Sequence, residues 1–199
     1  MTKYLIGAAA ILLIAAGGYY AWMWNGKNNT EPTITPTQES PQTYATSTFS
    51  LVHPAGYTAD ASYAYDQVSP TKPISGVKFT IPGTVATGTN LSGNTYISVE
   101  FLPRAKRCTG DIYLADNVRA QNITEGGIEY SLATSSGAGA GNFYEETVYA
   151  LATSSPCTAV RYFIHSTNIG NYDPGTVREF DRAALLSAFD KIRQSLVLH

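Results

Sequence analysis

Charged side chains are scarce in this chain. Lys, Arg, Asp and Glu make up 14% of its 199 residues, whereas about 25% is usual for a soluble domain. The 13 basic and 15 acidic residues nearly cancel, so no general excess of positive charge attracts nucleic acid or anionic lipid. We therefore expect no nucleic-acid partner.

Recognisable catalytic and metal-binding motifs are also missing. The sequence has no Gly-x-Ser-x-Gly element, and its three histidines, His53, His165 and His199, are scattered. It has no His-x-x-x-His, Cys-x-x-Cys or Asp-rich calcium loop, although a metal site needs several such ligands to converge. The glycine-rich stretch at 137–141 lacks the Lys and Ser/Thr of a phosphate-binding loop. We expect no metal and no cofactor, and an enzyme is the less favoured interpretation.

Cysteine occurs only twice, at Cys108 and Cys157. A disulfide between them would be typical of an exported domain, because extracytoplasmic compartments are oxidising. The bridge would close a loop of about 50 residues and stabilise the fold by ~4 kcal/mol in the chain-entropy model. The alternative is a reactive thiolate at Cys108, because Arg104, Lys106 and Arg107 are close in sequence and nearby cations lower a thiol pKa.

The chain contains one long run without charge, residues 4–24, YLIGAAAILLIAAGGYYAWMW. About 20 apolar residues in a helix cross the ~30 Å hydrocarbon core of a bilayer. Two Tyr and two Trp residues end the run, and such rings gather at the membrane–water interface. We predict an N-terminal transmembrane anchor, which makes the membrane a partner. The alternative is a cleaved signal peptide whose apolar core is residues 5–16.

The remaining chain divides by composition into a linker and a domain. Residues 25–48 are rich in Thr, Asn and Pro, which predicts a disordered tether because little apolar surface is available to offset ordering. Residues 49–199 are long enough for one domain with its own core. Lys3 and Lys27 flank the anchor evenly, so the cysteines and the linker decide its orientation. We expect a single-pass membrane protein whose C-terminal domain lies outside the cytoplasm, in a periplasm or at a cell surface.

Alternation with a period of two predicts strands through most of the domain. In residues 95–103, TYISVEFLP, apolar side chains alternate with Tyr, Ser and Glu, as in a half-buried strand. Further strands are predicted over residues 49–54, 62–68, 76–82, 127–134, 142–152 and 157–167. Turn residues separate them, which indicates antiparallel hairpins. Residues 110–121 could form a short helix.

The C-terminal segment carries the clearest helix signal of the domain. Thr176 to Glu179 has the form of a capping box. Apolar residues then recur at steps of three and four as far as Leu196, which predicts an amphipathic helix whose stripe covers a sheet. The predicted class is therefore α+β: an N-terminal transmembrane helix, a disordered linker, then one antiparallel sheet covered by a long C-terminal helix.

Both ends of the domain resemble those of PsbP-like (Mog1/PsbP-type) domains. The stretch FSLVHPAGY opens the domain at Phe49, and FDRAALLSAFDKIRQSLVL closes it from Phe180. The resemblance implies a small α/β/α domain with an antiparallel sheet, of a kind often attached to a membrane face as an accessory protein. It implies no functional residue.

Ionisable groups on the last two predicted strands could form a binding surface. His165 and Arg161 face the same side of one strand, and in one hairpin register Glu145 of the preceding strand would meet either of them. Such opposite charges are an ordinary cross-strand pair, and proton transfer is the alternative. The polar loop that follows contains Asn171 and Tyr172, and loops of this kind often bind ligands. We take Glu145, Arg161, His165, Asn171 and Tyr172 as the candidate binding surface.

Tyrosine is abundant, with 14 copies, mainly in the predicted strands. Exposed Tyr rings could stack on the sugars of a glycan, whereas half-buried Tyr is also common in strands.

Two functions are compatible with these features. The first is a membrane-anchored, extracytoplasmic, non-enzymatic module that binds or stabilises another envelope component, either protein or glycan. The second is an envelope hydrolase, active on glycan or peptide, with an unrecognised site. The tether favours the first, because it raises the effective concentration of a partner.

Overall fold

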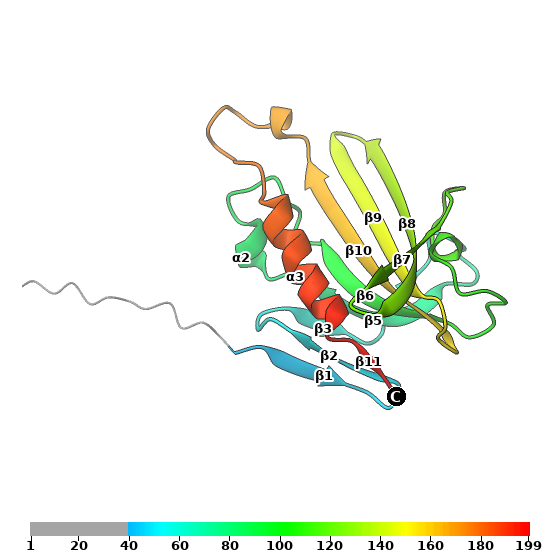
Figure 1. Cartoon of the computed structure of the whole chain (residues 1–199). Helices are drawn as coiled ribbons and strands as arrows, with labels where there is room; N and C mark the ends of the chain where they lie inside the picture. Colours follow the sequence, from blue (N-terminus) through cyan, green and yellow to red (C-terminus); the bar gives the residue numbers. More distant parts are fainter. Residues whose placement is uncertain (1–39) are drawn as a thin grey trace, which may run out of the picture. The chain divides into compact units, whose positions relative to one another are not determined.

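The computed structural model describes residues 40–199, which form two antiparallel sheets and a few short helices (Figure 1). No helix among these residues is both long enough and apolar enough to cross a membrane. The predicted anchor at 4–24, and most of the predicted linker, lie outside the described residues.

The elements are bounded as follows. The strands are β1 (Gln42–Ala45), β2 (Phe49–His53), β3 (Thr58–Asp60), β4 (Ala64–Tyr65), β5 (Ile74–Thr80), β6 (Tyr96–Leu102), β7 (Gln121–Glu125), β8 (Ile128–Gly139), β9 (Asn142–Leu151), β10 (Cys157–Thr167) and β11 (Val197–Leu198). The helical elements are α2 (Gly83–Ala86), α3 (Arg182–Gln194) and the 3-10 turns η1 (Gly110–Tyr113) and η2 (Ile169–Asn171).

The larger sheet has eight strands and brings distant segments together. Its order is β3-β5-β6-β10-β9-β8-β7, and β4 also pairs with β5. β10 lies in the middle, antiparallel to both β6 and β9. Side chains alternate along a strand, so Val160, Tyr162 and Ile164 face the main core. Arg161 and Phe163 face the opposite side of the sheet.

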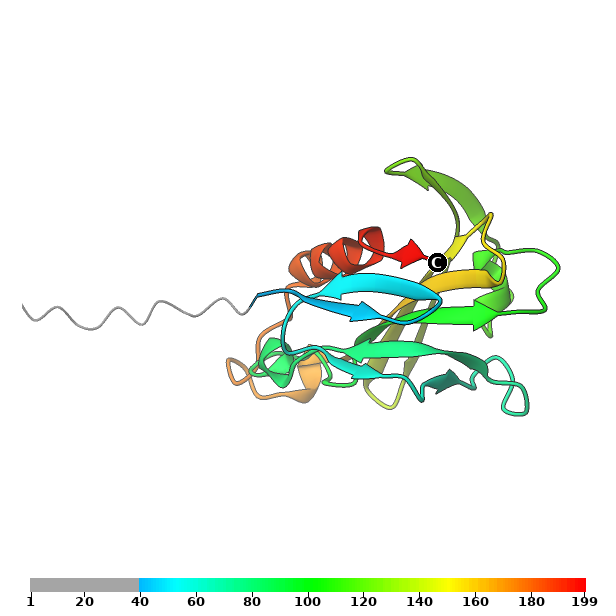
Figure 2. The same ribbon diagram turned by 90° about the horizontal axis from the view of Figure 1, so that it is seen from below.

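The smaller sheet, β1-β2-β11, joins the two ends of the described chain beside α3 (Figure 2). Phe49 and Leu51 of β2 are buried in the main core together with Phe189 and Ile192 of α3. Burial of each such side chain is worth about 1.5–3 kcal/mol, so this core holds both ends of the described residues in place. β1 lies inside the segment predicted as linker, and the folded chain therefore begins before Phe49.

The predicted α+β class is wrong. The described residues are mostly β and form two sheets, with one short C-terminal helix and no long helix that covers a single sheet. α3 has 13 residues and begins at Arg182. Asp181 caps it, because its carboxylate accepts a hydrogen bond of 2.9 Å from the backbone N–H of Ala184.

The predicted capping box at 176–179 precedes the helix because tertiary contacts hold its backbone extended. Arg178 forms a parallel bridge with Thr89, its N–H donates to the carbonyl of Gly88, and its carbonyl accepts from the N–H of Asn90. Backbone groups committed to a neighbouring chain segment cannot also close a helical turn. The start of the helix is therefore displaced to Asp181.

The predicted disulfide between Cys108 and Cys157 is confirmed, with the two Cα atoms 5.1 Å apart. It ties the segment after β6 to the first residue of β10 and excludes the free thiolate. The tied segment contains η1, which replaces the short helix predicted over 110–121. A Cβ at Gly110 would lie 2.7 Å from the Ser131 carbonyl oxygen, so only glycine allows this segment to approach β8 so closely.

Candidate functional site

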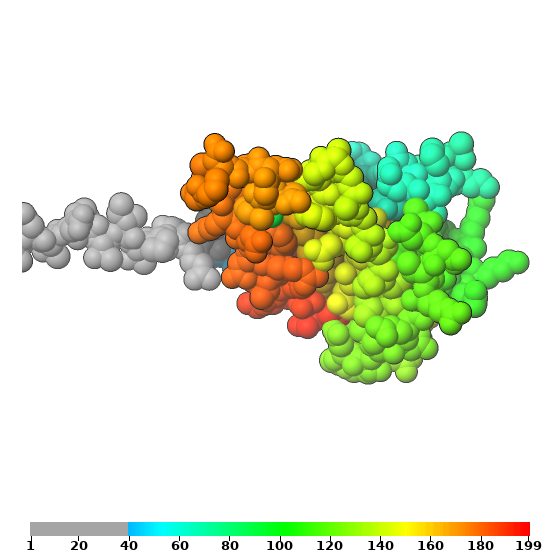
Figure 3. Space-filling model, turned by 90° about the horizontal axis from the view of Figure 1, so that it is seen from above, coloured from blue at the N-terminus to red at the C-terminus, as the bar shows by residue number. Residues whose placement is uncertain are grey.

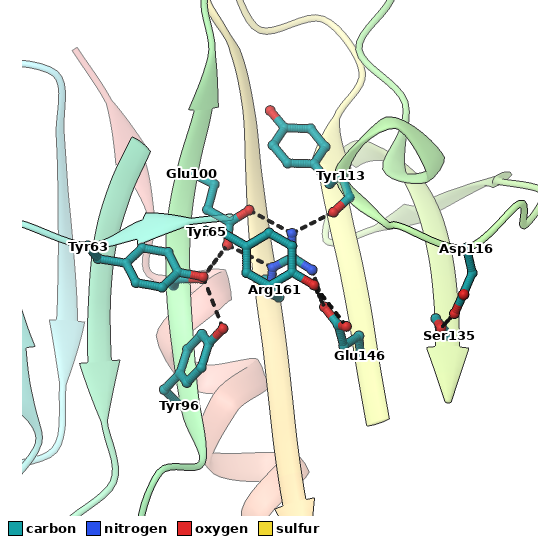
Figure 4. A network of polar contacts seen from close by, with 10 residues as sticks. Tyr63, Tyr65, Tyr96, Glu100, Tyr113, Asp116, Ser135, Glu146 and Arg161 are labelled. Atoms are coloured by element: carbon teal, nitrogen blue, oxygen red, sulfur yellow. Dashed lines mark hydrogen bonds and ion pairs between the residues drawn. The ribbon is translucent and has the colours of Figure 1, made fainter. Parts of the chain in front are cut away.

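A buried cluster of charges lies on the side of the larger sheet opposite the main core. Arg161 of β10 is fully buried, and its Nε donates to Glu100 Oε1 at 2.7 Å while its Nη2 donates to Glu100 Oε2 at 2.9 Å. Nη2 also donates to the Tyr113 carbonyl at 2.6 Å, and Nη1 pairs with Glu146 (Figure 4). The guanidinium therefore joins β6, β9 and η1.

The strand register explains this convergence. Ser98 of β6 and Val148 of β9 lie directly opposite Arg161. Glu100 follows Ser98 by two residues and Glu146 precedes Val148 by two, so both side chains lie on the same face of the sheet as Arg161. Diagonal neighbours in a sheet are within reach of long side chains, so one arginine can contact both carboxylates.

Three tyrosines complete the cluster. The Tyr65 ring covers Arg161 at 3.6 Å from the guanidinium carbon, and its hydroxyl donates to Glu146 at 2.9 Å. The Tyr63 hydroxyl donates to Glu100 at 3.0 Å and lies 3.0 Å from the Tyr96 hydroxyl. Burial raises the pKa of all three tyrosines, so they remain hydrogen-bond donors at neutral pH.

The charges stabilise one another at the cost of desolvation. Burial alone would lower the pKa of Arg161, but the charges of Glu100 and Glu146 and their hydrogen bonds outweigh it and raise that pKa. Burying a charge is unfavourable unless it is paired and hydrogen-bonded. Each charged group of this cluster meets that condition, which is typical of residues with a structural role. We call this cluster of Arg161, Glu100 and Glu146 the floor.

A groove of about 790 Å³ lies above this floor. Its aromatic lining is formed by Tyr63, Tyr65, Tyr96, Tyr144 and Phe163. The Tyr96 and Phe163 rings stack with their centroids 4.8 Å apart, and the Phe163 and Tyr144 centroids are 6.2 Å apart. Tyr63, Tyr144 and Phe163 are only half-buried, so part of each ring is open to the groove.

Polar side chains alternate with these rings. The lining includes Asp66, Gln67, Lys78, Thr80, Asn94 and Glu146. The Lys78 ammonium lies 5.5 Å from the centroid of Tyr63 and 5.8 Å from that of Tyr96, and it pairs with Asp60 at 3.4 Å. The groove can therefore offer aromatic surface together with donors and acceptors to one ligand.

His165 lies at one end of the aromatic row. Its ring stacks on Tyr144 with the centroids 4.5 Å apart. Its ring nitrogens are 2.7 Å from Asn94 Oδ1 and 2.9 Å from Asn142 Oδ1. Burial lowers the pKa of His165, so the imidazole is mainly neutral at neutral pH. It braces the ring of Tyr144 and the amide of Asn94.

The predicted pairing of Glu145 with Arg161 or His165 is wrong. The register places Ile164 opposite Glu145, and Tyr144 opposite His165. Glu145 points away from the groove and pairs with Arg182 of α3 at 2.6 Å. Its neighbour Glu146 pairs with Arg161 instead. A shift of one residue moves a side chain to the other face of the sheet.

The two predicted loop residues lie beside the tip of the β8–β9 hairpin. Asn171 donates from Nδ2 to the Gly141 carbonyl at 3.1 Å, and Tyr172 is exposed. In Figure 3 this orange segment lies next to the yellow-green end of the hairpin. The five predicted residues therefore do not form one surface: Arg161 and His165 share the groove face, and Glu145 lies on the other face.

Sequence reasoning missed Glu100, Glu146 and the covering Tyr63 and Tyr65. One signal was available, because the alternation in β6 already placed Glu100 on the same face as Tyr96. Its partner on β10, Arg161, could not be predicted from the sequence, because β6 and β10 are far apart in the chain. Among residues 40–199, no group of three His, Cys, Asp or Glu side chains could hold a metal ion.

Comparison with known proteins adds no family to this description. No family model matches the chain. No curated protein is significantly similar to it. The resemblance of the domain ends to PsbP-like domains therefore stays a prediction.

Proposed function

We propose that this protein is a membrane-anchored, extracytoplasmic module that binds another envelope component without turnover, and that the groove on the larger sheet is its binding site. One observation carries the proposal: half-buried rings of Tyr63, Tyr144 and Phe163 line an open groove whose charged floor is internally satisfied. Concave sites with aromatic walls and a few polar groups are the usual form of ligand sites.

The location outside the cytoplasm is supported by the disulfide. The bridge between Cys108 and Cys157 is expected to persist only in an oxidising compartment. The apolar run at 4–24 and the Thr/Pro-rich segment that follows would hold the domain close to the membrane. A partner in the same envelope would then meet the groove at high effective concentration.

Binding is favoured over hydrolysis by the state of the ionisable groups. Arg161 donates to Glu100, Glu146 and the Tyr113 carbonyl, and both carboxylates also accept from tyrosine hydroxyls. Both ring nitrogens of His165 lie within hydrogen-bond distance of side-chain amides, Asn94 at 2.7 Å and Asn142 at 2.9 Å. General acid–base catalysis needs a group that can reach the substrate proton, and each of these groups already has an internal partner.

Photocrosslinking in the native cell tests the proposal. A photoreactive amino acid replaces Gln67, an exposed residue of the groove lining, in the full chain. The matched control carries it at Thr134, an exposed residue of β8 whose side chain lies on the opposite face of the sheet. We expect a specific envelope protein or glycan adduct at position 67 and none at 134, identified by mass spectrometry.

Two results would overturn the proposal. One is the same adducts from both positions, or none from either. The other is hydrolysis of peptidoglycan or peptide by the purified protein that His165→Ala abolishes, which would favour the envelope hydrolase.

A further inference from the structure

We infer that the occupant of the groove is an oligosaccharide without acidic groups. The inference rests on the proposed function and names the class of ligand. It is carried by the arrangement of rings and polar groups along β6, β10 and β9.

The aromatic residues form a row across three neighbouring strands. Tyr96 of β6 lies directly opposite Phe163 of β10, and Tyr144 of β9 lies directly opposite His165 of β10. Stacking between the paired rings holds each of them upright on the sheet. The face of an aromatic ring is negatively polarised and attracts the weakly positive C–H groups of a pyranose ring. A row of fixed rings therefore suits a chain of sugar rings.

The polar groups of the lining suit hydroxyls. The side-chain amide of Asn94 carries a donor group and an acceptor group, and one of them meets His165 Nδ1 at 2.7 Å. The other can bind a hydroxyl of a ligand. Glu146 and Asp66 can accept, and Lys78 can donate. A purely apolar occupant would exclude water from the remaining donors and acceptors of these groups and offer them no hydrogen bond in exchange.

The charge balance selects against acidic ligands. The carboxylates in or next to the groove are Asp60, Asp66, Glu100 and Glu146, and the cations are Lys78 and Arg161. Both cations already pair with carboxylates, which leaves a negative excess. A phosphate-bearing polymer or a uronic-acid chain would be repelled, whereas a neutral or amino sugar would not.

Calorimetric titration of the full chain in lipid nanodiscs tests this inference. The probes are the tetrasaccharides of N-acetylglucosamine, glucosamine and galacturonic acid. We expect the first two to bind and the acidic tetramer to bind at least tenfold more weakly. Tyr144→Ala should weaken binding roughly tenfold through loss of stacking, while Tyr144→Phe keeps the ring and stays within about twofold.

The matched control is Phe143→Ala. Phe143 is the neighbouring residue on β9, is 44% exposed and lies on the opposite face of the strand, so its truncation should leave binding unchanged. Thermal unfolding of each variant separates loss of the fold from loss of the site. Phe163→Ala gives a second ring truncation if Tyr144→Ala unfolds the domain.

Three results would overturn the inference: no binding of the neutral and amino tetramers, equal binding of the acidic one, or binding that both ring truncations leave intact. If Gln67 crosslinks to an envelope protein while no tetramer binds, the inference fails and the proposed binding function stands. If neither experiment gives a signal, both fail.

Discussion

At the scale of single residues, Arg161 is the central cation of the buried cluster on the face of the larger sheet opposite the main core. Its side chain is fully buried, holds Glu100 of β6 and Glu146 of β9, and lies under the Tyr65 ring. Removing one partner of a buried ion pair leaves an uncompensated charge, which costs far more than loss of an exposed pair. The same chain contains such an exposed pair, Arg182 with Glu145.

The first prediction compares these two arginines. Arg161→Met should lower the free energy of unfolding by about 3–5 kcal/mol, because two buried carboxylates would lose their cation. Arg182→Met should change it by less than about 1 kcal/mol, because the pair is exposed and screened by water. Urea unfolding of both variants measures the difference. Equal effects would mean that the buried cluster does not stabilise the fold.

At the scale of elements, α3 shows how tertiary contacts choose between two helix starts. Thr176 and Asp181 are both residues that cap helices well. Asp181 caps α3 through the N–H of Ala184, whereas the hydroxyl of Thr176 donates to the Asp173 carbonyl in an exposed turn. Only the cap at Asp181 should therefore contribute to the stability of the helix.

The second prediction follows from this choice. Asp181→Ala should lower the free energy of unfolding by about 1 kcal/mol, through loss of the cap. Thr176→Ala should leave it within about 0.5 kcal/mol of wild type, as for most surface substitutions. Chemical denaturation of both variants decides between the two starts. A larger loss from Thr176→Ala would place the functional cap at the first position.

At the scale of the whole molecule, one covalent bond ties the η1 segment to the larger sheet. Cys108 and Cys157 are separated by 49 residues, and the segment between them includes β7, β8 and β9. A loop of this length is costly to close in the unfolded chain. The bridge therefore stabilises half of the larger sheet by restricting the unfolded state.

The third prediction concerns this bridge. Replacing both cysteines by serine should lower the free energy of unfolding by roughly 2–5 kcal/mol. Urea unfolding of the double variant measures the loss, and oxidised wild type is its reference. Alkylation of protein taken from its native compartment, with and without reductant, should find no free thiol before reduction. Two free thiols there would contradict both the bridge in the cell and the proposed location.

The sequence by itself determined the local character of the chain. Alternation over 95–103 and 157–167 reports which residues share a face, because the strand period depends only on backbone geometry. It therefore predicted β6, β10 and the shared face of Arg161 and His165. The cysteine count predicted the disulfide, because two cysteines allow one pairing.

Only the tertiary structure decided what the sequence pattern left open. The neighbours of β10 depend on strand order, so Glu100 could not be assigned to Arg161. The choice between Glu145 and Glu146 depended on a hairpin register of one residue. The helix began at Asp181 because Arg178 pairs with Thr89, and the second sheet exists because β2 pairs with both ends of the described chain. Long-range pairings of this kind are set by the packing of the whole core, so local sequence propensity does not predict them.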